Sequence, residues 1–81
     1  YGYPEYDSAE PVIPDTVRYG SRGAPVFKLQ RRLNATLGKD LEVDGIFGSE
    51  TLRLVKMFQT LNNIEADGIV GPITWKMLLA R

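Results

Sequence analysis

Neither cysteine nor histidine occurs in this sequence of 81 residues. Their absence excludes disulfides, zinc sites with nitrogen or sulfur ligands, thiol nucleophiles and every catalytic arrangement that needs a histidine. An apolar run of about eighteen residues, the minimum for a membrane-spanning helix, is also missing. We therefore expect no catalytic residue, no metal site and no cofactor, no contact with a membrane, and stability that comes from packing alone.

Charge is unevenly distributed, although the net formal charge is zero. Residues 1–17 contain four acidic residues and no Lys or Arg, whereas residues 18–81 contain ten basic and six acidic residues, a net charge of +4. We interpret 1–17, which is also rich in Pro and Tyr, as a linker or tail that packs loosely or not at all. Val12 and Ile13, which lie between two prolines, could dock as a short extended piece. Residues 18–81 then form one small domain, expected to be monomeric. The start at Tyr1, without an initiator Met or a signal peptide, predicts a fragment or a processed product.

Hydrophobic periodicity predicts three short helices. The first runs from Ala24 to about residue 37, with Gly38 in the left-handed conformation after its end. The second runs over about 49–61, followed by Asn63 in the same conformation, and the third covers 72–79 and is apolar on most sides, which predicts a central or covered position. Expected core residues of the first two helices are Val26, Leu29, Leu33, Leu37, Leu54, Val55, Phe58 and Leu61. The predicted fold is all-α, a compact three-helix bundle with two Asp-Gly loops and an extended N-terminal tail.

A repeated segment connects these helices. LEVDGIFGSETL at 41–52 and IEADGIVGPITW at 64–75 share six identities in twelve positions, which indicates a duplicated unit. The carboxylates of Asp44 and Asp67 are expected to accept from nearby backbone N–H groups, while Gly45 and Gly68 supply a positive φ. Each copy therefore predicts a fixed turn that leads into a helix.

Further positions of the repeat have expected structural roles. Gly48 and Gly71 are the expected N-caps of the second and third helices, and Pro72 is the expected first helical residue. We expect Ile46 and Ile69 to fill the core between the copies. The threonine hydroxyls in the first helical turns are expected to reach free backbone groups, and two pairs form hydrophobic staples: Phe47 with Leu52, and Val70 with Trp75.

Several side chains allow both a structural and a functional interpretation. Gln30 and Gln59 are expected mainly to brace loop backbone, although either amide could bond a ligand. Trp75 is expected in the core, and it would stack on a sugar only if its edge were exposed. Asp44 and Asp67 resemble a glycosidase pair in composition, but their identical contexts argue against separate acid and base roles. The basic residues of the first helix are most simply a solvated face: Lys28, Arg31 and Arg32.

Four motifs follow one another between Val17 and Leu79: V-x-x-L-Q, D-G-x-x-G-x-x-T, V-x-x-F-Q and D-G-x-x-G-x-x-T-W. In this order they resemble the bacterial peptidoglycan-binding domain family of three-helix modules. Ser49 stands where the family often has Pro, and Asn63 where it usually has Gly. The resemblance implies a secreted or wall-associated, non-catalytic module, bacterial or from a phage, that binds peptidoglycan glycan or stem peptide and targets an attached cell-wall hydrolase. Its catalytic domain would lie upstream. Our candidate ligand-binding residues are Gln30, Asp44, Gly45, Gln59, Asp67, Gly68 and Trp75.

Alternative functions are those of a small helical interaction domain. Nucleic-acid binding would need a recognition helix with several polar and basic base-reading residues, which the apolar third helix lacks; we therefore expect no nucleic-acid partner. An inhibitory prodomain of a metalloprotease contains a similar helical module, but this sequence lacks the cysteine that those propeptides use to block zinc. An enzymatic activity of the domain itself is disfavoured by its small size and by its lack of His and Cys.

Overall fold

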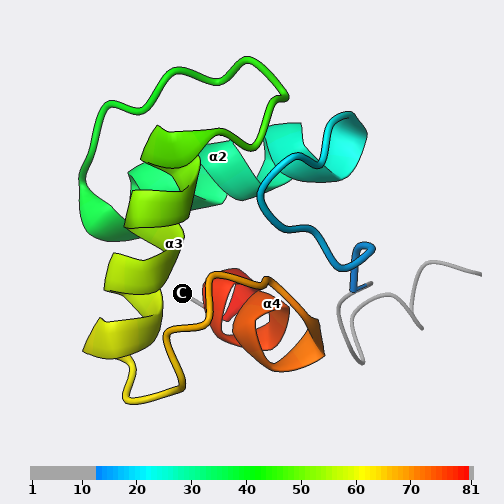
Figure 1. Ribbon diagram of the computed structural model, residues 1–81. Coiled ribbons are helices and arrows are strands. Elements are labelled where there is room, and N and C mark those ends of the chain that lie inside the picture. Colours follow the sequence, from blue (N-terminus) through cyan, green and yellow to red (C-terminus); the bar gives the residue numbers. More distant parts are fainter. Residues whose placement is uncertain (1–12, 81) are drawn as a thin grey trace, which may run out of the picture.

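The chain contains three helices in the residues that the computed structural model describes, 13–80. They are α2 (Ala24–Leu37), α3 (Ser49–Leu61) and α4 (Pro72–Leu79), and Figure 1 shows them with the loops that join them. The predicted all-α, three-helix fold and the helix bounds are therefore confirmed. No helix of residues 13–80 has the length and apolar character needed to cross a membrane.

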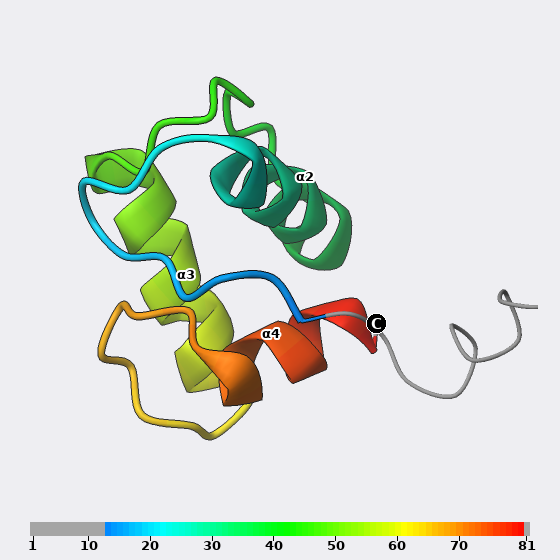
Figure 2. The same ribbon diagram turned by 90° about the vertical axis from the view of Figure 1, so that its right-hand side faces the viewer.

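α2 contacts both α3 and α4. The segment before α2 runs along both Asp-Gly loops and pairs with each of them (Figures 1 and 2). Val17 forms an isolated antiparallel bridge with Val70 in the second loop, and Arg22 forms one with Ile46 in the first loop. Ser21 adds a bond, since its carbonyl accepts from the N–H of Phe47 at 2.9 Å. One short segment, with a turn between Arg18 and Ser21, thereby fixes both loops relative to the start of α2.

Residues 13–17 lie against the domain, and Ile13 docks as the sequence allowed, whereas the burial of Val17 was not expected. Val17 is buried, and Ile13 packs against the core. The Asp15 carbonyl accepts a hydrogen bond of 3.0 Å from Trp75 Nε1. The folded unit thus includes residues that we had placed before the domain boundary; the rest of the predicted tail, 1–12, lies outside the described residues.

One hydrophobic core joins the three helices and the two loops. Trp75 lies within it with 0% of its surface exposed, so the predicted core position is confirmed. Two expectations are wrong: Leu61 is 67% exposed, and α4 is not covered on all sides, because Ile73 is 67% exposed. Periodicity identifies the face of a helix but not how far neighbouring elements extend along it. The buried apolar residues are Val17, Val26, Leu29, Leu33, Phe47, Leu54, Val55, Phe58, Val70, Trp75 and Leu78.

Glycine and asparagine form the helix ends as expected. Gly48 and Gly71 are the N-caps of α3 and α4. Gly38 and Asn63 have φ values of 65° and 60°, in the left-handed region that these residue types tolerate. Arg32 differs from the expected solvated face: it is half-buried, and its Nη2 donates to the carbonyl oxygen of Leu78 at 2.8 Å, which ties α2 to the end of α4.

Candidate functional site: two Asp-Gly turns and their pockets

The first Asp-Gly turn is held by a buried glutamine of α2. Gln30 Nε2 donates to Asp44 Oδ1 and to the Ile46 carbonyl, both at 3.0 Å, and to Thr51 Oγ1 at 3.1 Å. Gln30 Oε1 accepts from the N–H of Gly45 at 2.9 Å. As predicted, Asp44 Oδ1 also accepts from backbone, the N–H of Ile46 at 3.0 Å. The side chain of one helix thus connects the turn to the first residues of the next helix.

The second turn repeats this network with a glutamine of α3. Gln59 Nε2 donates to Asp67 Oδ1 at 3.1 Å, to the Ile69 carbonyl at 3.0 Å and to Thr74 Oγ1 at 3.2 Å. Gln59 Oε1 accepts from the N–H of Gly68 at 3.0 Å, and Asp67 Oδ1 accepts from that of Ile69 at 2.9 Å. We call each of these two hydrogen-bond networks a glutamine cage. The duplication inferred from the sequence is therefore a duplication of contacts as well.

Only glycine fits without strain at the second position of each Asp-Gly turn. Gly45 has φ 77° and Gly68 has φ 75°, as expected from the Asp-Gly pattern. A Cβ on Gly45 would overlap the ring of Phe27, and a Cβ on Gly68 would overlap the side chain of Leu52. Phe27 is itself 39% exposed.

Both turn aspartates are held in their ionised form. The hydrogen bond from Gln30 and then that from the Ile46 N–H lower the pKa of Asp44 below its usual value. The N–H of Ile69 is the main cause that lowers the pKa of Asp67. A glycosidase pair needs one carboxyl group with a raised pKa as the acid. Two equally placed carboxylates with lowered pKa values therefore argue against catalysis at this pair.

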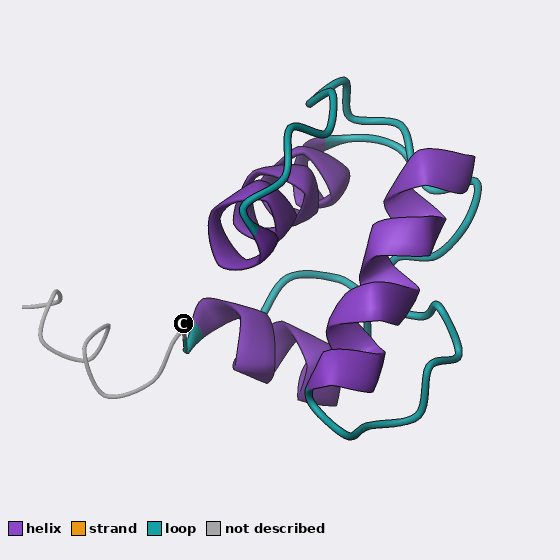
Figure 3. Cartoon of the chain, turned by 90° about the vertical axis from the view of Figure 1, so that its left-hand side faces the viewer, coloured by secondary structure: helices purple, strands orange, loops and turns teal. Residues whose placement is uncertain are grey.

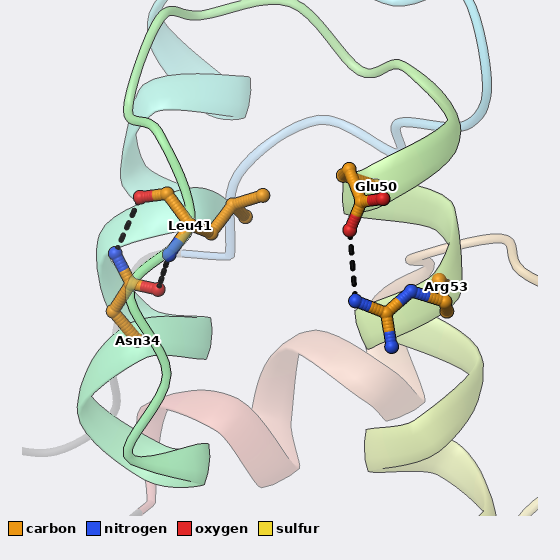
Figure 4. A network of polar contacts seen from close by, with 4 residues as sticks. All are labelled: Asn34, Leu41, Glu50 and Arg53. Carbon is orange, nitrogen blue, oxygen red and sulfur yellow. Dashed lines mark hydrogen bonds and ion pairs between the residues drawn. The ribbon is translucent and has the colours of Figure 1, made fainter.

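A pocket of about 340 Å³ lies beside the first turn, at the N-terminal end of α3. Asn34 fixes one wall of it: its Nδ2 donates to the Leu41 carbonyl at 2.9 Å, and its Oδ1 accepts from the Leu41 N–H at 2.8 Å (Figure 4). This two-way bond holds residue 41 of the loop against α2. The pocket is lined by Gln30, Asp40, Leu41, Glu42, Asp44, Ile46, Gly48, Ser49, Glu50 and Thr51.

The lining of the first pocket is acidic. Four of its ten residues carry carboxylates and none is Lys or Arg. Glu50 is paired with Arg53 at 2.8 Å (Figure 4), but both side chains are mostly exposed, and such a pair contributes little to stability. Across residues 13–80, His, Cys, Asp and Glu side chains form no group of three or more arranged to hold a metal ion. The pocket is therefore suited to neutral or cationic organic groups rather than to a nucleic-acid backbone.

The structure separates the candidate residues into three groups. Asp44 and Asp67 are exposed and accessible to a ligand. The glutamines of the two cages are 1% exposed and brace loop backbone, and Gly45 and Gly68 are buried with them. Trp75 does not meet the condition set for stacking, because its indole is fully buried and its N–H is bonded to Asp15.

The structure differs from the expectations for the two isoleucines and for the two threonine hydroxyls of the repeat. Ile46 was expected in the core, but it is 42% exposed and lines the pocket, and its counterpart Ile69 is half-buried. Phe47 is the residue that points inward. The hydroxyls of Thr51 and Thr74 accept from the glutamine amides. Sequence reasoning missed Leu41 and Asn34 as residues that build the pocket, and no local pattern marks them, since their contact depends on how the loop folds back on α2.

Comparison with known proteins gives a consistent result. The profile of the family described as "Putative peptidoglycan binding domain" matches residues 22–78. The zinc D-Ala-D-Ala carboxypeptidase of Streptomyces albus G is 38% identical over 65 residues, which cover 78% of this chain and 26% of that enzyme.

Solved structures show the same similarity in three dimensions. The crystal structure of an endolysin from the Burkholderia phage AP3 is 48% identical with a TM-score of 0.79, and the match covers 83% of this chain and 25% of that one. The SleB N-terminal domain is 32% identical with a TM-score of 0.77, and the match covers 82% and 90% of the two chains. The chain spans 18% to 59% of the length of five curated relatives that it matches.

Proposed function

The chain belongs to the peptidoglycan-binding domain family, and we propose that it is a non-catalytic module that binds murein and thereby holds an attached cell-wall hydrolase on the bacterial wall. Family membership supports association with the cell wall. A targeting role follows from the relatives, because the matched region makes up only about a quarter of both the carboxypeptidase and the endolysin. In such an arrangement the module raises the local concentration of the hydrolase at its substrate.

The pocket beside the first Asp-Gly turn is our proposed binding site, and its preformed shape carries the proposal. Gln30 and Asn34 hold the walls through buried or two-way hydrogen bonds, so the pocket needs no rearrangement before a ligand enters. Asp44 offers Oδ2 as an acceptor, because its cage bonds end on Oδ1. Ile46 adds an exposed apolar surface at the pocket wall. Acceptors beside a small apolar surface suit the amide, hydroxyl and methyl groups of a glycopeptide.

Retention on murein sacculi tests this function. The purified chain is incubated with insoluble sacculi at low and at moderate salt, with cellulose as the control polymer. We expect retention on sacculi at both salt concentrations and none on cellulose. Binding that disappears as salt rises would instead assign the interaction to the basic residues alone, and no retention at low salt would refute the function for this domain.

A matched pair of surface variants tests the site. Ile46→Ser removes an exposed apolar side chain from the pocket, and Leu61→Ser removes one outside it. We expect Ile46→Ser to weaken retention by at least about fivefold, the loss of roughly 1 kcal/mol that an interface contact carries. Leu61→Ser is expected to bind like the unmodified chain. Equal binding by both variants would move the site away from the first turn.

A further inference from the structure

The second Asp-Gly turn carries a smaller depression of about 140 Å³. Its position relative to the turn and to the following helix is the same as that of the first pocket. Each of its five lining residues within the repeat has a counterpart, at the same place of the repeat, in the lining of the first pocket, and Gln59 corresponds to Gln30 through its role in the cage. In matching order, the second lining is Gln59, Ile64, Glu65, Asp67, Ile73 and Thr74, and the first is Gln30, Leu41, Glu42, Asp44, Glu50 and Thr51.

The two glutamine cages give both Asp-Gly turns the same form. Corresponding hydrogen bonds of the two cages differ in length by 0.1 Å or less. Asp67, like Asp44, is exposed and uses Oδ1 for its cage bonds, so its Oδ2 is available to a donor. The second depression therefore presents an acceptor in the same place as the first pocket does.

The two linings differ most in chemistry at one position. The first has Glu50, whereas the second has Ile73, a large apolar side chain that is 67% exposed on the first turn of α4. Ile64, which is half-buried, supplies a second aliphatic side chain to the same lining. Aliphatic side chains together with a few polar groups in a depression are the usual lining of a small-ligand site. The second depression is thus the less charged and more apolar of the two.

We propose that this depression is a second subsite of the domain, which takes a methyl group adjacent to an amide N–H. The methyl would pack on Ile64 and Ile73, and the N–H would donate to Asp67. In murein this chemistry occurs in the acetamido group of the amino sugars and in the alanyl residues of the stem peptide. This inference rests on the proposed function, because both subsites would bind one wall polymer.

The two subsites lie near opposite ends of α3. Thr51 of the first cage is in the first turn of α3 and Gln59 of the second cage is near its end, eight residues later, or about 12 Å along the axis. Figures 1 and 3 show the two loops at these ends. A polymer with repeating units offers the same groups at more than one place, so one domain can contact two of them. Two weak contacts on one domain strengthen retention, since the second becomes intramolecular.

Amide NMR on the full chain tests the second subsite, with the N–H signals of Gly45 and Gly68 as reporters of the two turns. A soluble muropeptide is titrated first, followed separately by peptide-free N-acetylated glycan and by free stem peptide. We expect the muropeptide to shift both signals. Ile73→Ser, at an exposed position, is expected to abolish the shift of Gly68, to leave that of Gly45, and to lower retention on sacculi by about threefold or more. Leu61→Ser is the matched control and is expected to change none of these.

The outcomes distinguish the two proposals. A Gly68 shift with glycan alone supports the acetamido group as occupant, and one with stem peptide alone supports an alanyl residue. A shift confined to Gly45, with full retention by Ile73→Ser, overturns the second subsite and leaves the proposed function intact. An Ile73→Ser effect on both reporters overturns the claim of separate subsites. Failure of the unmodified chain to bind sacculi overturns the proposed function itself.

Discussion

Replacing Gln30 with Leu is the most direct perturbation of the first cage. Leu has a similar volume but no polar atoms, so all four cage bonds of Gln30 are lost. Asp44 and Ile46 are exposed, so the carboxylate and the carbonyl that they offer regain water, but the N–H of Gly45 and the hydroxyl of Thr51 are buried and lose a partner. A buried polar group without a partner costs about 1–3 kcal/mol, so two of them cost about 2–6 kcal/mol together, of which we take about 3 kcal/mol as the expected loss.

This cost is large for a domain of this size. Total stability at roughly 0.05–0.15 kcal/mol per residue is about 3–10 kcal/mol for residues 13–80. A loss of about 3 kcal/mol lowers the melting temperature by about 15 °C in a domain of this length. Thermal unfolding followed by far-UV circular dichroism measures it. Gln59→Leu removes the equivalent bonds of the second cage and is expected to give a similar decrease, whereas Arg31→Leu, at an exposed position of α2, is expected to change stability by less than about 0.5 kcal/mol.

The same variant separates bracing from ligand contact. If Gln30 braces the loop, Gln30→Leu lowers the melting temperature whether or not murein is present. A decrease of less than about 4 °C, equivalent to less than about 1 kcal/mol, would refute the cage as a stabilising network. An unchanged melting temperature together with lost retention on sacculi would show instead that the Gln30 amide contacts the ligand, which is the second interpretation that the sequence allowed.

Two further outcomes follow from the first turn. Gly45→Ala is expected to destabilise the domain by about 2–3 kcal/mol, because it adds an overlap with Phe27 to the cost of a positive φ. Gly38→Ala is the control: a Cβ there meets nothing within 4 Å, so we expect it to cost only about 1 kcal/mol. Equal melting temperatures of the two variants would show that Phe27 moves aside freely. Because the pKa of Asp44 is lowered on folding, its contribution to stability is complete above the ordinary value of 3.8 and is lost as pH falls through the lower folded pKa. Melting curves between about pH 5 and pH 2 are expected to show a shallower decline for Asp44→Asn, and a slope identical to that of the unmodified chain would contradict this.

The helices and turns could be predicted because their causes are local. Periodic apolar residues define each helix, and glycine or asparagine at positions such as Gly38 and Asn63 meets a backbone requirement that few other residues tolerate. The Asp-Gly turn is equally local, since the carboxylate of Asp44 bonds the N–H two residues later. The proposed function came from the resemblance to a family, whereas the geometry of the turn was predicted from the residues alone.

The errors concern positions that tertiary contacts decide. In the extended stretch after Gly45, neighbouring side chains alternate in direction, and the bond between the Phe47 N–H and the Ser21 carbonyl fixes which one points inward. Ser21 lies before α2, so no pattern within the repeat shows that Phe47 is buried and Ile46 exposed. Docking of Ile13 was allowed by the sequence, but the burial of Val17 was missed for the same reason, because Val17 pairs with a loop more than fifty residues later.

The cage explains how one structural device can serve two different pockets. Its buried members, the glutamine, the glycine and the threonine, are the same in both copies. A change of the glutamine or the threonine leaves polar groups unpaired, and a side chain on the glycine overlaps a neighbouring side chain. The exposed lining carries no such constraint, and there the copies differ, with Glu50 in one and Ile73 in the other. Recognition can therefore change at the exposed positions without a cost to folding. If this separation holds, exchanging Glu50 and Ile73 changes which fragment each pocket prefers and leaves the melting temperature within a few degrees of the original.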